Sequence, residues 1–261
     1  MSRTLILSDI HFGKRSSTVK SIDQLRPIWQ GFDALVLNGD TSELHSTASP
    51  DASKQATDEI RNAAVEDNVQ LTMLCGNHDP DISDREHLWF HNKTTLVFHG
   101  HTPVTGVAPW SWRCKYIAEN NKKYIQRNGD GFKEQLIATR TASTMAATGK
   151  FKQHRPKSPY MIMLGIPATY RVLQCWWKYP SLVADWIKQY APSAAFVITG
   201  HIHHAGIWKR GGITVINTGC FGFPSHPRAV VIDNDVMQVY RIKKSNNYFE
   251  LGRVCASWNV L

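Results

Sequence analysis

Short apolar runs recur along the first hundred residues, and a polar motif follows each run at once. Every one of these motifs places Asp, His or Asn beside Gly or Ser. Apolar runs of this length, bounded by turn-forming residues, predict buried strands. The four runs are Leu5–Leu7, Ala34–Leu37, Leu71–Leu74 and Thr95–Phe98.

Two stretches with helical spacing lie between the predicted strands. Apolar residues from Val19 to Trp29 recur at helical intervals, and Pro50–Asp67 carries Ala56 and Ile60 on one face. Short strands that alternate with helices predict an α/β fold in which both faces of a sheet are covered.

The alternation stops after the fourth strand. Residues 102–190 show no clean strand pattern, and we expect them to form a mostly helical insertion within a single domain of residues 1–261. Helices are predicted over Trp112–Arg127, Phe132–Ala147 and Tyr160–Trp177, with a basic, proline-bearing loop at Phe151–Pro159. Residues 182–190 return to the core at helical spacing.

Strands return in the last third of the chain. Asp233–Asp235 reads as a hairpin turn between two of them, so this region is predicted to be rich in antiparallel strands. The predicted strands are Ala195–Ile198, Gly212–Asn217, Ala229–Ile232 and Val236–Ile242.

The positive charge of the chain belongs to one segment. The formal net charge is +9, and residues 102–180 hold thirteen Lys and Arg against three Asp and Glu. The remainder is balanced, with seventeen basic and eighteen acidic residues. Because four tryptophans share the basic segment, it indicates an anionic partner: a phosphate substrate, nucleic acid or a membrane surface. A helical lid with a solvated cationic face is the alternative.

Three features of composition favour a cytoplasmic protein. The chain enters a strand pattern at Thr4, which leaves no room for a signal peptide, and no apolar run reaches the 18 residues of a membrane span. The five cysteines lack CxxC spacing, which argues against a zinc–thiolate site and fits a reducing compartment.

The strand-end motifs are predicted to meet in space. In open α/β sheets ligands bind outside the carboxyl ends of the strands, so residues far apart in sequence converge there. The collected side chains are imidazoles, carboxylates and one amide, without a thiolate, a set that suits Mn, Fe, Zn or a mixed pair. They are Asp9, His11, Asp40, Asn77, His78, His99, His201 and His203. A pair of metals needs a bridging carboxylate, and Asp40 is the natural candidate.

Five motif blocks, in this order and spacing, resemble the signature of the calcineurin-like metallophosphoesterases. The blocks are Asp9-Ile10-His11, Gly39-Asp40, Gly76-Asn77-His78-Asp79, His99-Gly100-His101 and Gly200-His201-Ile202-His203. The resemblance covers residues 1–101 and roughly 191–240 but not the insertion. It implies a layered α/β sandwich of the α+β type, with two mixed β-sheets flanked by helices. It also implies a dinuclear metal-dependent phosphoester hydrolase, in which a metal-bridging hydroxide attacks a phosphomonoester, phosphodiester or pyrophosphate bond.

The resemblance implies a role for each matching residue. Asp9, His11 and His203 would bind the first divalent metal. Asn77, His99 and His201 would bind the second, and Asp40 would bridge the two. His78 would face the leaving group or the phosphoryl oxygens. Asp79 would orient His78 by accepting its other ring proton.

The substrate stays open at this level. Gly39–Glu43 and the helical insertion are loosely similar to the UDP-2,3-diacylglucosamine hydrolases, which suggests a phosphorylated small-molecule or lipid-linked substrate and peripheral contact with the inner membrane face. The fourth block departs from that subgroup, because it reads His-Gly-His rather than His-Gly-Asp. A nuclease that acts on DNA or RNA through the basic insertion is the alternative.

Three further residues are candidates for substrate contact. His101, His204 and Cys220 lie in or after strand-end motifs, and each could equally be a packed or exposed residue. A non-catalytic interaction module with the same fold is a third reading, but no ligand position of the motif is lost. Nothing in the sequence implies a protein partner.

Overall fold

A first, six-stranded sheet carries the N-terminus of the chain. The computed structural model describes residues 3–14, 16–44, 50–148, 161–222 and 226–260. The strand order is β11-β10-β9-β1-β2-β3. β1, β2 and β3 are parallel, whereas β9, β10 and β11 add to β1 as an antiparallel meander. The strands are β1 (Thr4–Leu7), β2 (Ala34–Asn38), β3 (Gln70–Leu74), β9 (Arg228–Asp233), β10 (Val236–Ser245) and β11 (Tyr248–Asn259).

The second sheet has five strands in the order β4-β5-β6-β8-β7. β5, β6 and β8 are parallel, and the antiparallel strands β4 and β7 form the two edges. The strands are β4 (His87–Phe90), β5 (Thr95–Phe98), β6 (Phe196–Thr199), β7 (Gly206–Arg210) and β8 (Ile213–Asn217). Both sheets are therefore mixed.

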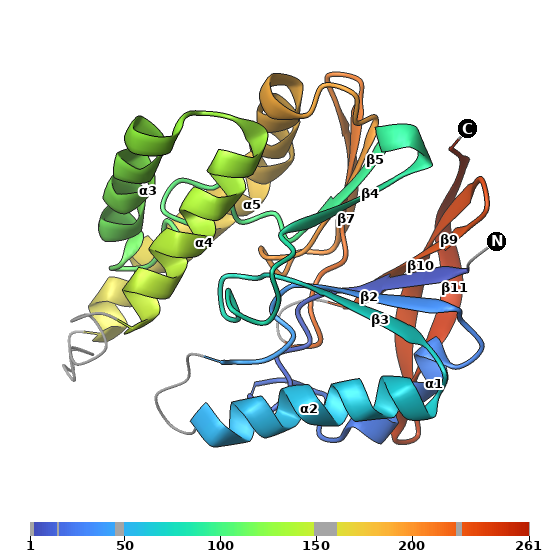
Figure 1. The fold of residues 1–261 in the computed structure, drawn as a ribbon. Coiled ribbons are helices and arrows are strands. Elements are labelled where there is room, and N and C mark those ends of the chain that lie inside the picture. Colours follow the sequence, from blue (N-terminus) through green and yellow to red (C-terminus); the bar gives the residue numbers. More distant parts are fainter. Residues whose placement is uncertain (1–2, 15, 45–49, 149–160, 223–225, 261) are drawn as a thin grey trace.

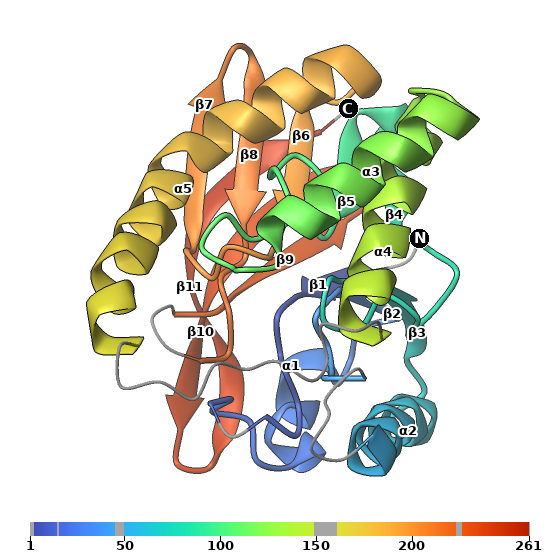
Figure 2. The ribbon, with the colours of Figure 1, turned by 90° about the vertical axis from the view of Figure 1, so that its left-hand side faces the viewer.

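The two sheets pack face to face, with helices on their outer faces (Figures 1 and 2). Ile6, Val36, Val97 and Ile198 belong to the buried cluster between the sheets. A second cluster joins the outer face of the six-stranded sheet to η1 (Ile22–Gln24), α1 (Arg26–Trp29) and α2 (Pro50–Glu66). A short η2 (His91–Lys93) connects β4 to β5.

The insertion contains three helices, α3 (Cys114–Asn128), α4 (Phe132–Thr148) and α5 (Met161–Tyr190). α4 and α5 pack on the other outer face, that of the five-stranded sheet, while α3 packs on α4 (Figures 1 and 2). Cys175, Tyr179, Val183 and Ile187 are buried against the sheet, at the spacing of one stripe along α5. No helix within the described ranges is long and apolar enough to cross a membrane.

The predicted fold class is confirmed: the chain forms a layered sandwich of two mixed sheets flanked by helices. The predicted helices at 112–127 and 132–147 correspond to α3 and α4 within a residue or two. The predicted basic loop at 151–159 lies outside the described residues. α5 runs unbroken through Pro167 and Pro180, where the sequence indicated two segments. Packing of its apolar stripe on the sheet stabilises it beyond the local preference.

Three strands were not predicted, namely β4, β7 and β11. Two of them form the edges of the five-stranded sheet and the third an edge of the six-stranded sheet. Edge strands bury less of their surface, so their sequences alternate less clearly between apolar and polar residues. β8 also differs from the antiparallel expectation, because it pairs in parallel with β6.

Candidate metal centre

All the predicted ligand residues lie just beyond strands at one edge of the sandwich. Asp9 and His11 follow β1, Asp40 follows β2, and Asn77 follows β3. The second sheet supplies His99 after β5, and His201 and His203 after β6. The side chains converge because parallel strands of both sheets end at this edge.

The backbone at these strand ends is held in an unusual conformation. The five residues Asp9, His11, Asp40, His201 and His203 all have φ between 48° and 72°. This left-handed region is sparsely populated by residues other than glycine, and such residues cluster at functional sites. Gly200 is required beside them, since a Cβ there would collide with Oδ2 of Asp9.

A first group of donor atoms comes from Asp9, His11, Asp40 and His203, whose ligand atoms all lie within 4.8 Å of one another. Nε2 of His203 lies 3.3 Å from Oδ1 of Asp9 and 3.0 Å from Nε2 of His11. Oδ2 of Asp40 lies 3.8 Å from Nε2 of His11. This group contains the three residues predicted for one metal together with the predicted bridge.

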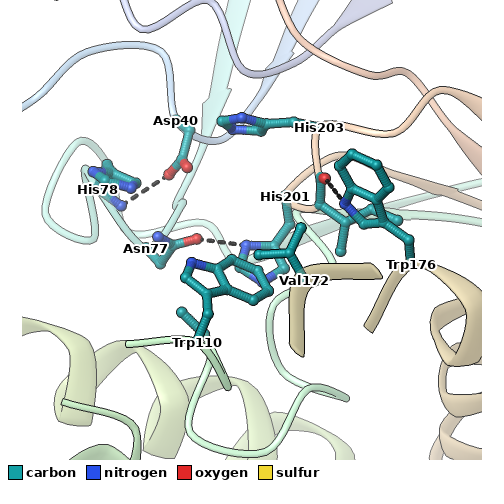
Figure 3. A pocket seen from close by; sticks show the side chains of 10 residues that line it. Asp40, Asn77, His78, Trp110, Val172, Trp176, His201 and His203 are labelled. Atoms are coloured by element: carbon teal, nitrogen blue, oxygen red, sulfur yellow. Dashed lines mark hydrogen bonds between the residues drawn. The ribbon is translucent and has the colours of Figure 1, made fainter. Parts of the chain in front are cut away.

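A second group forms around the side-chain oxygen of Asn77. Its Oδ1 lies 2.8 Å from Nδ1 of His201 (Figure 3). The same oxygen lies 3.2 Å from Nε2 of His99. Oδ2 of Asp40 lies 3.4 Å from the same nitrogen of His99. Asp40 therefore contacts both groups, as a bridging carboxylate must.

The remaining ring nitrogens of these histidines are committed to acceptors. Nε2 of His201 donates to the carbonyl of Val107 at 2.8 Å, and Nδ1 of His99 donates to the carbonyl of Asn38 at 2.9 Å. Nδ1 of His11 lies 2.8 Å from Glu43. Each of these partners fixes the tautomer that turns the other nitrogen toward the centre, the arrangement typical of metal-binding histidines.

The contact between Asn77 and His201 tests whether the residues fit a cation. Burial lowers the pKa of His201 to about 3, so its ring is neutral. With Nε2 acting as donor, Nδ1 presents a lone pair to the carbonyl oxygen of Asn77, and two acceptors face each other at 2.8 Å. A positive charge between them removes this repulsion. The donor set thus fits a divalent metal.

The two predicted ligand carboxylates, Asp9 and Asp40, remain charged despite their burial, because their pKa values lie below the usual range. Burial alone would raise the pKa of Asp40, but His99 and His78 outweigh it and hold that pKa well below its usual range. Burial opposes protonation of His99, yet Asp40 raises the pKa of His99 to about 9. Without a metal, a proton on His99 balances Asp40, and a cation would replace that proton.

His78 lies at the rim of the centre, and its expected partner is different. Its Nδ1 lies 3.0 Å from Oε2 of Glu43, whose other oxygen contacts His11 and Lys14. Burial opposes the charged ring, but Asp40 and Glu43 outweigh it and raise the pKa of His78. Glu43 therefore takes the orienting position that the sequence assigned to Asp79.

Asp79 instead holds the backbone of the strand-end loops. Its carboxylate accepts bonds from the N–H groups of Asp40, Thr41, Ser42 and Gly76 at 2.7–3.2 Å. A fully buried carboxylate with four such donors fixes two ligand loops relative to each other. The predicted Asp79–His78 contact was wrong, because the side chain is turned to these N–H groups.

The three candidates for substrate contact, His101, His204 and Cys220, lie in different surroundings. His101 is buried beside the rings of His99 and His201, at centroid distances of 5.3 and 6.0 Å. His204 stacks on Trp176 at 4.8 Å, away from the ligand atoms. Cys220 is buried. Burial lowers the pKa of His203, but Asp9 and the thiol of Cys220 outweigh burial and raise that pKa. We keep direct substrate contact by any of the three as a prediction.

A cavity of about 260 Å³ opens over the centre (Figure 3). The polar part of its lining comes from predicted ligands and His78, and the apolar part from the insertion and Ile202. The lining residues are Asp40, Asn77, His78, Ala108, Trp110, Val172, Trp176, His201, Ile202 and His203. The insertion therefore supplies an apolar, partly aromatic wall opposite the polar donors.

Sequence reasoning missed several residues of this site. Glu43 lies three residues beyond Asp40 in the Gly39–Glu43 segment. This proximity to a predicted ligand was the only indication in the sequence that Glu43 belongs to the site. The Val107 carbonyl, Trp110 and Trp176 had no signal beyond the aromatic composition of the insertion, because only folding places them against the centre.

The family model for the calcineurin-like phosphoesterases matches residues 2–205. The chain belongs to this family. The matched range contains all the predicted ligand residues, including the Asp/His cluster at the strand ends. No curated protein matches the chain.

Among solved structures, a dimetal phosphatase from Danio rerio aligns with 12% identity and a TM-score of 0.50, covering 100% of this chain and 99% of the other. The phosphoesterase Yfce from E. coli aligns with 12% identity and a TM-score of 0.45, covering 99% and 100%. Zinc-bound Vps29 from Entamoeba histolytica aligns with 12% identity and a TM-score of 0.45, covering 97% and 98%. At 12% identity, the likeness to the dimetal phosphatase from Danio rerio shows a shared fold and no more.

Proposed function

We propose that the chain is a dinuclear metal-dependent phosphoester hydrolase. The observation that carries the proposal is the pair of donor groups that share Asp40. His11, His203 and Asp9 face one position, and Asn77, His99 and His201 face the other. Two divalent cations, which we expect to be Mn, Fe, Zn or a mixed pair, would neutralise phosphoryl oxygens and lower the pKa of water.

The protein's own groups then position the substrate. His78 is oriented by Glu43 and its pKa is raised, so its ring can hold a proton for the departing oxygen. A phosphate bound against the donors would lie in this cavity, and Trp110, Val172 and Trp176 would contact the remainder of the substrate. Because these side chains come from the insertion, we propose that the insertion selects the substrate.

The apolar wall supports a phosphorylated small molecule or a lipid-linked substrate with an apolar or aromatic group next to the scissile phosphate. The likeness to UDP-2,3-diacylglucosamine hydrolases, peripheral membrane contact and a cytoplasmic location remain part of this proposal. Nucleic acid is the second candidate, since aromatic walls beside basic segments also suit bases and backbone phosphates.

Metal content and turnover test the proposal directly. Purified protein is loaded with Mn, Fe or Zn, dialysed and analysed by mass spectrometry, and p-nitrophenyl phosphate and bis(p-nitrophenyl) phosphate serve as substrates. We expect about two metal ions per chain, since two donor groups are present, and metal-dependent hydrolysis. A protein that binds metal without hydrolysing mono- or diesters would instead favour the non-catalytic interaction module. A protein that binds no metal would contradict the proposal outright.

His201→Ala separates the two donor groups. This change removes a ligand of the second group but leaves Asp9, His11 and His203 in place, so we expect about one metal per chain and loss of turnover. Lys209→Ala, an exposed residue of β7, is the control and should keep both metals. Two metals in the His201→Ala protein would show that His201 is not a ligand.

A further inference from the structure

Two arginines occupy inward-facing positions of the six-stranded sheet. Arg228 of β9 and Arg241 of β10 are directly opposite each other in the antiparallel register. Their side chains share a face with Val230 and Val239, which belong to the buried cluster between the sheets. Like charges directly opposite on neighbouring strands repel each other. The pair therefore stands where the apolar interior opens to solvent and where an anion would relieve the repulsion.

The two arginines line a cavity of about 490 Å³ with a third, Arg253 of β11. The remaining lining residues are Ile207, Val254 and Cys255. Ile207 belongs to β7, so both sheets contribute to the cavity. Arg228 is half-buried, whereas Arg241 and Arg253 are exposed and can move toward a ligand.

Among the residues that the structure describes, these three guanidinium groups lack the carboxylate partners that Arg26 and Arg140 have. Arg26 and Arg140 each form ion pairs with carboxylates at 2.6–3.1 Å. Within the described part of the chain, which contains every Asp and Glu, no carboxylate lies within ion-pair distance of the three. Burial lowers the pKa of Arg228 and the neighbouring Arg241 lowers it further, while Cys255, which lines the same cavity, opposes them.

The arginine cavity lies at the same end of the sandwich as the metal centre. β9 is antiparallel to β1, so Arg228 begins its strand where β1 delivers Asp9. Ser8 contacts both Asp9 and Thr218 at 2.5 Å, and the carbonyl of Thr218 accepts the backbone N–H of Arg228 at 2.8 Å. On the other sheet, β7 carries Ile207 directly after the loop that holds His203. A substrate bound at the centre can therefore extend toward the arginines.

We propose that Arg228, Arg241 and Arg253 form a second phosphate-binding site, which holds another phosphate of a substrate that carries at least two. Guanidinium groups bind phosphate oxygens through paired hydrogen bonds, and three of them provide more donors than one phosphate requires. This site rests on the proposed function for its role in substrate selection. Its capacity to bind phosphate does not depend on hydrolysis.

Direct binding tests the site without catalysis. The probe is a fluorescein-labelled oligothymidylate, and its Kd is measured by anisotropy on metal-free protein over a range of salt concentrations. For Arg241→Gln/Arg253→Gln we expect a Kd about tenfold higher and a salt slope smaller by about 1.4, from two lost phosphate contacts. Lys209→Gln/Arg210→Gln removes two exposed charges of β7 outside the cavity and is the matched control. Equal losses of affinity in the two variants would overturn the proposal.

Kinetics with the metal-loaded protein then show whether the arginines bind a phosphate of the substrate or a free phosphate ion. The double arginine variant should raise KM for unlabelled oligothymidylate about tenfold at an unchanged kcat, while KM for bis(p-nitrophenyl) phosphate stays the same. In a further outcome, inorganic phosphate binds through the arginines but the double arginine variant changes neither Kd nor KM for the oligonucleotide. This result would overturn the proposed substrate site and indicate a site for a free anion. Arginine-dependent binding without any hydrolysis would support this site while contradicting the proposed function.

Discussion

The indole Nε1 of Trp176 donates a hydrogen bond to the carbonyl of Ile202 at 2.8 Å (Figure 3). Ile202 lies between His201 and His203, which face the two donor groups, and Trp176 belongs to α5 of the insertion. The same indole stacks on His204 at an interplanar angle of 13°. The insertion thus holds the loop that closes the centre as well as covering it.

We expect Trp176→Phe to weaken metal binding. Phenylalanine keeps an aromatic ring against His204 but leaves the Ile202 carbonyl without its donor, so the ligand loop is held less firmly. Changes of this kind to groups that support ligands cost about 10- to 100-fold in metal affinity or activity. Titration with Mn²⁺, followed by turnover of bis(p-nitrophenyl) phosphate, measures the change. Trp177→Phe is the matched control, since Trp177 is 80% exposed; equal losses in both variants would refute the role of the hydrogen bond.

Glu43 and Asp79 should have separable effects. Glu43→Gln removes the charge that orients His11 and His78, and we expect turnover to fall by about 10- to 100-fold while thermal stability stays close to that of the wild type. The measurements are kcat and the melting temperature of the metal-loaded protein.

Asp79→Asn should instead reduce stability. An amide in place of the carboxylate turns an NH₂ group toward backbone N–H donors of Asp40, Thr41, Ser42 or Gly76. We expect a loss of about 2–3 kcal/mol in the free energy of unfolding, measured by urea denaturation. A stable Asp79→Asn protein with selectively reduced kcat would restore the catalytic role predicted from the sequence.

Removal of metal should destabilise the folded chain. The donor groups exist only in the native structure, so each bound ion stabilises it by about 2.7 kcal/mol at a free concentration 100-fold above its Kd. We expect EDTA to abolish turnover and lower the melting temperature, and Mn²⁺ to reverse both effects. In the His201→Ala protein the change in melting temperature should be smaller, because one donor group is incomplete. An identical change in both proteins would argue against two sites.

Asp67 should make stability depend on pH far from the centre. Burial opposes its charge, but Arg26 and Trp29 donate to it at 2.6–2.9 Å, and their hydrogen bonds lower its pKa. Because the folded pKa lies below the unfolded value of about 3.9, the stabilisation is complete above that pH and is lost as pH falls through the folded pKa.

We therefore expect Asp67→Asn to lower the free energy of unfolding by about 1–3 kcal/mol at pH 7. The difference from the wild type should shrink below about pH 4. Asp58→Asn, which removes an exposed carboxylate of α2, the helix that ends just before Asp67, should change stability by about 0.5 kcal/mol or less. Urea denaturation at pH 3 to 7 provides the comparison, and a constant Asp67→Asn difference over that range would contradict the account.

The contacts of the insertion bear on how substrate selection can be tested. Val107, Trp176 and Tyr179 each bond to a loop that carries ligands, through His201, Ile202 and Gly100. Deletion of residues 102–180 would therefore remove supports of the centre together with the cavity wall. Substitutions at Trp110 or Val172, which line the cavity, separate substrate selection from assembly of the site.

The core strands and the residue types of the candidate centre could be predicted from short stretches of sequence. Each ligand motif directly follows the strand that positions it. The strand and its motif can therefore be predicted from one short segment, without knowledge of contacts elsewhere in the chain. The edge strands β4, β7 and β11 were beyond reach, because their partners lie elsewhere in the chain and their faces are only partly buried.

The groups that support the ligands could be identified only after the chain was folded. Asp79 follows His78 in sequence, yet its carboxylate turns to four backbone N–H groups, and Glu43 reaches His78 from another loop. The indole of Trp176 and the carbonyl of Val107 likewise support ligand loops that lie far from them in sequence. Such contacts depend on how the layers pack and on which side-chain direction each strand end imposes. Local sequence encodes neither.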